Sequence, residues 1–355
     1  MIQNLNLDNA ILLTFISLLI STLLSWGSIK IAPLIGLMDI PGSAEHKRHK
    51  NPIPLTGGIV LIDLVVVMVF FTSLWKDSKI LGILLSGIII SIFGLLDEFF
   101  NLSPIKKFFG QIIGSVCLIY LGIQINIFSS PEFFFHTQSD LDFWLNILFT
   151  IFWIVTITNA FNFIDSIDGL AIGLSILSIV FFLFISIISG QAAILNLCSI
   201  LLGGCIGLYF FNAYPARIFL GDSGAQTLGF ILGSIAIVFD PSTGNQSSTW
   251  FAPILFFYVP LFDLILVIVS RIRRKKNIYQ ASRDHTFHRL SQIGLPVQEA
   301  VLLMHGFSFD AIKAQIDAQN DLVNEVGKKE TREYEKAVET VKSSKYRLAK
   351  LTEEL

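Results

Sequence analysis

Residues 169–211 read GLAIGLSILSIVFFLFISIISGQAAILNLCSILLGGCIGLYFF, a stretch without a single Asp, Glu, Lys or Arg. It contains two apolar runs, 169–189 and 191–211, on either side of Gly190. A helix needs about 20 apolar residues to cross roughly 30 Å of hydrocarbon. Both runs meet this requirement, so the stretch predicts two consecutive membrane-spanning helices.

The same composition extends over most of the chain, which has 355 residues, 53% of them hydrophobic and only 15% charged. Soluble proteins usually carry about 25% charged residues, so the composition argues against a water-soluble protein. We predict an all-α, polytopic membrane protein with about nine to ten transmembrane helices. The nine clear spans are 9–30, 55–75, 79–97, 106–127, 142–160, 169–189, 191–211, 223–239 and 251–270. A tenth apolar piece, 296–309, is short, and the sequence leaves open whether it spans.

The formal net charge of -2 excludes a strongly basic nucleic-acid binder. The three cysteines, Cys117, Cys198 and Cys205, all fall inside apolar runs and show no Cys/His spacing typical of a metal site. We interpret them as small hydrophobic residues.

The cations alternate between the two sides of the predicted spans. One side holds Lys47, Arg48, Lys50, Lys106, Lys107, Arg217 and the basic run that begins at Arg271, and the other holds only Lys76 and Lys79. Cytoplasmic loops are enriched in Lys and Arg. The pattern therefore predicts that the N-terminus faces outward and that the loops after the odd-numbered spans face the cytoplasm.

Every unusual polar cluster falls on this predicted cytoplasmic side. The first is 37–58, LMDIPGSAEHKRHKNPIPLTGG, which contains His49. It is either a basic stop signal followed by a Pro/Gly entry into the next helix, or a basic loop whose glycines let phosphate groups approach the backbone closely.

Two further clusters contain neighbouring acids and amides. Asp97 and Glu98 are adjacent carboxylates at the end of a span, and Lys106 and Lys107 follow. Adjacent acids raise one another's pKa or share a cation. In NAFNFIDSIDGLAIG, residues Asn159, Asn162, Asp165 and Asp168 recur at every third position. A helical cap explains one Asp but not all four residues, and ionisable groups at membrane depth are usually functional.

The remaining clusters admit two interpretations each. Asp222 in RIFLGDSGAQTLGF is either an ordinary helix N-cap or part of a magnesium–diphosphate site. His285, His288 and Arg289 in SRDHTFHRL are either part of a zinc site or contacts for phosphates and a sugar, and the second is favoured because no third zinc ligand is near in the sequence. Asp263 is either a helix–helix hydrogen-bonding partner or a weaker site candidate.

Together these residues form one chemical picture. Carboxylates and amides suit Mg²⁺, cations suit a diphosphate, and the apolar surroundings suit a lipid. Phosphoryl transfer depends mainly on positioning and charge neutralisation. A metal in such a site would hold the phosphates with only one or two protein ligands.

In this order, the motifs resemble those of the polyprenyl-phosphate N-acetylhexosamine-1-phosphate transferases, and most closely the bacterial undecaprenyl-phosphate GlcNAc-1-phosphate enzymes. The matching blocks between residues 37 and 296 are D-x-P with KRH and P-x-P-x-x-GG, LDE, NAFNxIDxxDGLA, GDSGA and HxxHRL.

The resemblance implies a cytoplasmic catalytic cleft in the bacterial inner membrane and admits a homodimer. The implied reaction converts a UDP-N-acetylhexosamine and undecaprenyl phosphate into undecaprenyl-diphospho-sugar and UMP, with Mg²⁺, or with Mn²⁺ as the alternative ion. The implied metal ligands are Asp222 and Asn162, and the implied catalytic acids are Asp97, Glu98 and Asp165. The implied substrate contacts are Asp168, Lys107, His49, His285, His288 and Arg289.

Four departures separate the chain from the family pattern. Glu98 stands where the family usually has a second Asp, Ser166 replaces a common Gly, and Phe287 occupies a position often held by His. The fourth is the charged segment 310–355, which predicts a soluble helical tail after a membrane domain of 1–309. The donor is interpreted as UDP-GlcNAc, with another UDP-aminosugar or the MurNAc-pentapeptide donor as alternatives. A transporter for an anionic lipid or nucleotide and an inactive binding homologue are the alternatives from other classes.

Overall fold

The computed structural model describes residues 7–41, 51–129, 140–239, 252–275, 285–292, 294–310 and 313. The chain divides into two compact units, Met1–Asp310 and Ala311–Leu355. The first unit contains every helix and strand described below. The predicted soluble tail lies almost wholly outside the described residues, as does His49.

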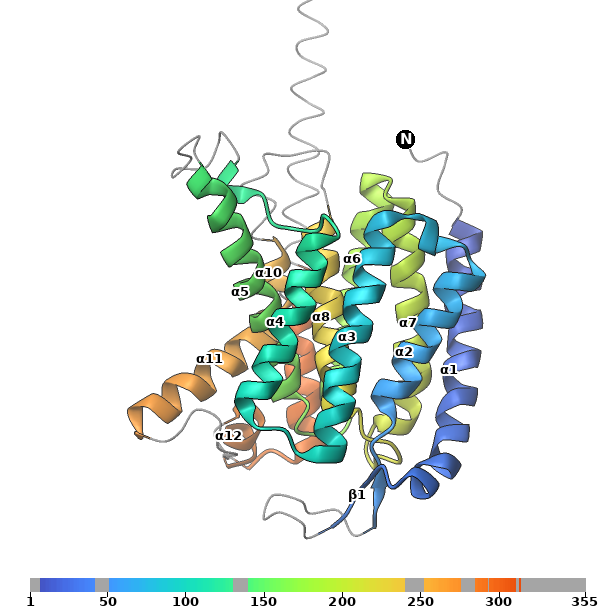
Figure 1. Cartoon of the computed structure of the whole chain (residues 1–355). Helices are drawn as coiled ribbons and strands as arrows, with labels where there is room; N and C mark the ends of the chain where they lie inside the picture. The colour runs from blue at the N-terminus through green and yellow to red at the C-terminus, as the bar shows by residue number, and fades with distance from the viewer. Residues whose placement is uncertain are drawn as a thin grey trace, which may run out of the picture. The chain divides into compact units, whose positions relative to one another are not determined.

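The described part of the first unit is built from α-helices (Figure 1). They are α1 (Leu7–Ile35), α2 (Gly57–Phe71), α3 (Ser78–Phe100), α4 (Pro104–Tyr120), α5 (Asp140–Ile164), α6 (Leu170–Ser189), α7 (Ala192–Asn212), α8 (Gly221–Val238), α10 (Ala252–Phe256), α11 (Tyr258–Arg273) and α12 (Thr286–Gln292). Two short 3-10 helices, η2 (Leu74–Lys76) and η3 (Ile127–Ser129), lie between them. Two-residue strands β1 (Met38–Asp39) and β2 (Ile53–Pro54) pair antiparallel.

The helices confirm the predicted all-α class, and each of the first eight predicted spans coincides with one helix to within several residues. Five helices within the described residues are long and apolar enough to cross a membrane, namely α1, α3, α5, α6 and α7. The turn between α6 and α7 is made by Gly190 at φ +71°. Glycine adopts this left-handed conformation without steric cost, which explains how two spans follow each other so closely.

The ninth predicted span, 251–270, is not one helix. α10 ends at Phe256 and α11 begins at Tyr258, and α11 runs obliquely to the other helices (Figure 1). Pro260 in the first turn of α11 has no N–H with which to bond the carbonyl of Phe256. Ser178 of α6 donates its hydroxyl to that carbonyl instead, at 3.3 Å. Proline and a neighbouring serine together account for the break.

Helix α8 lies at the centre of the bundle and is buried along nearly its whole length. It packs against α2, α3, α5 and α6 (Figure 1). Because α8 begins at Gly221 and the site residue Asp222 follows at once, this burial fixes the position of one candidate site residue relative to four other helices.

The helices α1 and α7 pack against each other through small residues. Ser17, Ser21 and Ser25 form a buried stripe on α1, and Ser21 donates to the carbonyl of Gly204 at 2.7 Å. A Cβ atom on Gly203 would lie 2.1 Å from the carbonyl oxygen of Thr14. Small residues let membrane helices approach closely enough for van der Waals packing, so this pair is held without any charged contact among the described residues.

The segment 297–310, whose apolar length alone did not decide its structure, is helical. Ala300, Met304 and Ser308 recur at every fourth position and are buried. The Nε2 atom of His305 lies 3.3 Å from the carbonyl oxygen of Leu170, at the start of α6. This helix therefore packs one face against the bundle.

Candidate active site

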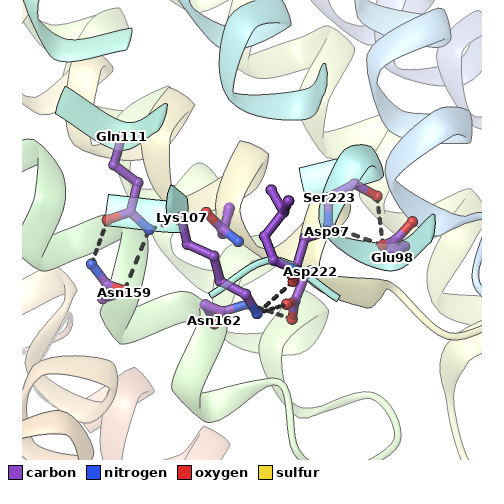
Figure 2. Close-up of polar contacts among 10 residues, drawn as sticks. Asp97, Glu98, Lys107, Gln111, Asn159, Asn162, Asp222 and Ser223 are labelled. Atoms are coloured by element: carbon purple, nitrogen blue, oxygen red, sulfur yellow. Dashed lines mark hydrogen bonds and ion pairs between the residues drawn. The ribbon is translucent and has the colours of Figure 1, made fainter. Parts of the chain in front are cut away.

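Four helix ends meet at one end of the bundle: the last turn of α3, the first turn of α4, the last turns of α5 and the first turn of α8 (Figure 2). They bring together Asp97, Lys107, Asn162 and Asp222, four residues that were selected from their sequence motifs. Residues separated by more than 100 positions in the chain, such as Lys107 and Asp222, are thus neighbours.

Lys107 lies at the centre of this group. Its Nζ atom forms ion pairs with Asp97 and with the Oδ2 atom of Asp222, the second at 2.6 Å. The Lys107 and Asp222 side chains are 31% and 34% exposed, whereas the Asp97 side chain is 6% exposed. An external ligand therefore has access to Lys107 and Asp222. Asp97 pairs with Lys107 from the buried side.

The second oxygen of each carboxylate is also bound. Asn162 donates from Nδ2 to the Oδ1 atom of Asp222 at 2.9 Å. The Oδ1 atom of Asp97 accepts from the backbone N–H of Leu102 at 2.8 Å. Asn101, at φ +48°, ends α3 in the left-handed conformation that Asn tolerates better than most residues. The chain reversal after α3 thereby fixes the orientation of Asp97.

Glu98 binds the beginning of α8. Its Oε1 atom accepts from the backbone N–H of Ser223 at 3.0 Å and from the Ser223 hydroxyl at 2.9 Å. Its Oε2 atom is buried and has no hydrogen-bond partner among the described residues. A carboxylate at the N-terminal turn of a helix satisfies free N–H groups and complements the helix dipole. Glu98 thus contacts the residue that follows Asp222.

The glycines of the first polar cluster serve packing in this structure. Gly57 and Gly58 donate their N–H groups to the carbonyls of Phe219 and Leu220, each at 3.1 Å. A Cβ atom on Gly58 would lie 2.1 Å from the hydroxyl of Ser223. These glycines therefore let α2 lie close to the start of α8. From the sequence, they were expected to let phosphate groups approach the backbone.

Asp165 and Asp168 lie in the turn between α5 and α6. The Oδ2 atom of Asp168 accepts from the backbone N–H of Ala216 at 3.0 Å, which links this turn to the segment that precedes α8. Burial raises the pKa of Asp165 well above its usual range, and the negative charges of Asp222, Asp168 and Glu98 raise it further. Asp165 is therefore within electrostatic reach of the Asp222 group.

The His285 segment is anchored on α11. The Nδ1 atom of His285 lies 2.8 Å from the Oδ2 atom of Asp263, and the Thr286 N–H donates to the other oxygen at 2.7 Å. Asp263 and His285 are 1% and 7% exposed. His285 thus serves to hold the segment in place, and Asp263 has the hydrogen-bonding role that was one of its two interpretations from the sequence.

His288 and Arg289 follow on α12, and Arg289 is exposed. Phe163 follows Asn162 in α5, and the centroid of its ring lies 6.3 Å from the centroid of the His285 ring. The segment therefore adjoins the end of α5, and the substrate contacts predicted for His285, His288 and Arg289 remain predictions.

Two residues in this region were not selected from the sequence. Gln111 of α4 and Gln226 of α8 are both buried, and Gln111 donates to Gln226 at 3.0 Å. Each lies four positions along its helix from a site residue, Lys107 or Asp222. The only feature of the sequence that could have identified them is the presence of a polar glutamine within an apolar span.

The donor set suits a hard divalent cation. The Lys107 ammonium group already binds one carboxylate oxygen each of Asp97 and Asp222, which shows that these two side chains can hold a cation between them, and Glu98 has a buried oxygen without a partner among the described residues. Within the described ranges, no group of three or more His, Cys, Asp or Glu side chains is arranged to hold a metal by itself. Mg²⁺ is commonly held by one or two carboxylates together with substrate phosphates, so the residues fit this ion.

Comparisons with known proteins identify the family of this chain. Residues 80–240 match the family described as glycosyl transferase family 4. Over 305 residues the chain is 32% identical to the probable undecaprenyl-phosphate N-acetylglucosaminyl 1-phosphate transferase of Bacillus subtilis, covering 84% of this chain and 83% of that protein. The chain belongs to this family.

Relatives named for two different reactions have similar identity to the chain. The decaprenyl-phosphate N-acetylglucosaminephosphotransferase of Mycobacterium leprae is 30% identical over 289 residues, covering 74% of this chain and 72% of that protein. The phospho-N-acetylmuramoyl-pentapeptide-transferase of Borrelia turicatae is 30% identical over 290 residues, covering 74% of this chain and 80% of that protein. The family match contains Asp97, Lys107, Asn162 and Asp222 but ends before Asp263 and His285.

Proposed function

We propose that this protein transfers N-acetylglucosamine 1-phosphate from UDP-GlcNAc to undecaprenyl phosphate and releases UMP. The observation that carries the proposal is the pairing of the partly exposed Lys107 with Asp97 and Asp222 at helix ends of an apolar bundle. A phosphorylated lipid and a sugar nucleotide can meet only at such a boundary between apolar and aqueous surroundings. The names of the glycosyl transferase family 4 relatives supply the sugar and the lipid.

In the proposed reaction, an oxygen of the lipid phosphate attacks the phosphorus next to the sugar. One P–O bond forms there, and the bond from this phosphorus to the bridging oxygen breaks, so that UMP leaves with the electron pair. Lys107 neutralises charge on the phosphates, since it has three N–H donors and is accessible. Asp97 is the acid expected to orient the lipid phosphate, and we propose that it acts through Lys107.

Mg²⁺ is proposed to bind at Asp222 with Asn162 adjacent, and when bound it would neutralise and orient the phosphates. Asn162 supports this assignment because its amide holds one oxygen of Asp222 and leaves the carboxylate in a single orientation. Glu98 holds the N–H of Ser223 and so keeps the first turn of α8 in place. Burial and the neighbouring carboxylates raise the pKa of Asp165 and so favour its protonated form, and we propose that this carboxyl group donates a hydrogen bond in the site.

The site is proposed to face the cytoplasm in a bundle of nine to ten spans in the bacterial plasma membrane. The end of the bundle that carries Lys107 also carries Lys106, Arg217 and the basic end of α11. The loop between α2 and α3, at the other end of both helices, contains Lys76. The positive-inside rule therefore supports a cytoplasmic site. The catalytic cleft and a homodimer remain predictions.

The test is a transfer assay with the purified full chain, undecaprenyl phosphate and Mg²⁺. Donors are UDP-GlcNAc, UDP-GalNAc and UDP-MurNAc-pentapeptide, and both UMP and organic-phase sugar are measured. We expect equal amounts of the two products with UDP-GlcNAc. Product from the pentapeptide donor alone would assign the other reaction named among the relatives, and no UMP from any donor would refute the proposed activity.

Asp222→Asn tests the metal assignment with an isosteric side chain. We expect turnover to fall about 10³-fold, because a neutral amide is a weaker ligand for Mg²⁺ than a carboxylate is. Asp77→Asn is the matched control, since Asp77 caps α3 at its far end and Asn is an equally good N-cap. Near-normal turnover of Asp222→Asn would contradict the assignment.

A further inference from the structure

Three amide side chains form a layer one helical turn deeper in the bundle than the Asp222 group, and we call Gln111, Asn159 and Gln226 the amide layer. Gln111 and Asn159 exchange hydrogen bonds in both directions, at 2.7 Å from Asn159 Nδ2 and 3.3 Å from Gln111 Nε2. Gln111 also donates to the Oε1 atom of Gln226 at 3.0 Å. Figure 2 shows Gln111 and Asn159 facing each other beside the site. The layer joins α4, α5 and α8.

Each member of the amide layer has a counterpart in the site on its own helix. Gln111 lies four residues after Lys107, Gln226 four residues after Asp222, and Asn159 three residues before Asn162. Side chains three or four residues apart in a helix lie on the same face, about one turn from each other. The layer and the site are therefore two parallel sets of contacts between the same three helices.

The contacts of the layer are all internal to the protein. Gln111 and Gln226 are each 3% exposed, so a substrate at Lys107 and Asp222 does not reach them. Asn159 binds Gln111 and the carbonyl of Val155 in its own helix. Gln111 and Gln226 are therefore placed to act through other residues and not by contact with a substrate.

The layer constrains the helices in a way that apolar packing does not. A buried amide without a partner is costly in an apolar interior, and rotation or sliding of one helix would break these bonds. Apolar side chains in a membrane tolerate such shifts more easily, because lipid and protein surroundings are similarly apolar. The pairing of the three amides therefore opposes displacement of the helices that carry Lys107, Asn162 and Asp222.

We propose that Gln111, Asn159 and Gln226 are positioning residues for the transfer reaction, with Gln111 as the central member. This inference rests on the proposed function only for its kinetic readout. A displacement of about 1 Å in a site costs about 10²-fold in rate. Disruption of the layer is accordingly expected to lower kcat and to leave the KM for the sugar nucleotide nearly unchanged.

Two Gln→Glu substitutions separate the donor role of Gln111 from the effect of adding an acid. Each adds one carboxyl group of nearly the same shape as the amide that it replaces. Gln226→Glu keeps an oxygen that accepts from Gln111, whereas Gln111→Glu removes both donations from position 111. We expect kcat to fall about 10²-fold in Gln111→Glu, with KM within about threefold. Gln226→Glu should retain most of the turnover. Gln124→Glu, which changes a glutamine beyond the far end of α4, is the control.

Hydrogen exchange provides a readout that needs no activity. Peptides covering the first turns of α4 and α8 should exchange faster in Gln111→Glu than in the wild type, and at wild-type rates in Gln124→Glu. If Gln111→Glu does not fold, Gln111→Met replaces it, because it removes the same donations without a charge. Its exchange in these turns and its kcat should change in the same directions.

The outcomes separate the two proposals. If the wild type releases no UMP, the proposed function fails, and unchanged exchange in the Gln111 variant would refute the positioning role on its own. If the wild type is active, equal kcat values for Gln111→Glu and Gln226→Glu would overturn the inference, as would a change confined to KM. A selective loss of kcat together with faster exchange would support it.

Discussion

The two ends of α5 both carry polar side chains that bond within the protein, but those side chains have different partners. Near the start of the helix, Asn146 accepts from the backbone N–H of Phe128 at 3.0 Å and Thr150 accepts from that of Ile125 at 2.9 Å. Near its end, Asn159 and Asn162 bind side chains of α4 and α8. The first set satisfies the backbone of a loop, and the second set joins helices at a charged group.

The comparison shows that burial of a polar residue in a membrane helix does not by itself mark a functional site. Asn146 is 1% exposed and bonds the backbone and Ser129. Asp222 combines opposite charge nearby with partial exposure. The end of α5 near Asn162 differs from its start because charged side chains meet there and remain accessible. Substitutions at the two ends test this difference.

Of the substitutions that test this difference, Lys107→Met should have the largest effect. This change removes the cation between Asp97 and Asp222, and turnover should fall by about 10²-fold or more, because charge neutralisation at the phosphates is lost. The neighbouring Lys106 is exposed and provides the control variant Lys106→Met. Turnover and the melting temperature in detergent would be measured for both. Equal activities of the two variants would show that a general basic surface, and not Lys107, is what matters.

Asn146→Leu should lower stability and leave turnover nearly unchanged. It removes the acceptor of the partly buried N–H of Phe128, which costs about 1 kcal/mol of stability. The melting temperature should therefore fall while kcat stays within about twofold of the wild type. Asn162→Leu, an identical change at the other end of the same helix, should mainly reduce kcat. A loss of turnover in Asn146→Leu at temperatures where it is folded would remove the distinction between the two ends.

The smallest effect concerns the pH dependence of stability through Asp165. Its pKa is raised in the folded protein by burial and neighbouring carboxylates, so the folded state binds a proton that the unfolded state has already released. Stability from this group is complete at about pH 4 and below and is lost as pH rises toward the folded-state pKa. Asp165→Asn cannot ionise and should lose less stability over this range.

The measurement is the melting temperature of Asp165→Asn and the wild type between about pH 4 and pH 8. The advantage of the variant should grow with pH. An advantage that is constant or shrinks would indicate that Asp165 is already ionised at low pH.

Much of the fold could be predicted because membrane helices follow directly from apolar length. The break before α11 was missed, although Pro260 offered a signal, because the compensating hydroxyl of Ser178 comes from another helix. The residues Asp97, Asn162 and Asp222 could be selected because acids and amides at helix ends are unusual in an apolar chain.

Other features of the site depended on distances that no local pattern encodes. The roles of Gln111 and Gln226 depend on a contact between positions 115 residues apart. The pairing of His285 with Asp263 likewise depends on the path of α11. The glycines at 57 and 58 were interpreted as sites where phosphate groups approach the backbone, and the sequence did not identify the start of α8 as their neighbour.

A double-mutant cycle on Asn162 and Asp222 tests most directly whether the converging helix ends act as one catalytic unit. We predict that Asn162→Leu lowers kcat on its own but adds little when Asp222 is already Asn, because the amide acts by orienting that carboxylate. The same cycle with Asn146 in place of Asn162 should show independent effects. Additive losses for Asn162 and Asp222 would contradict the account.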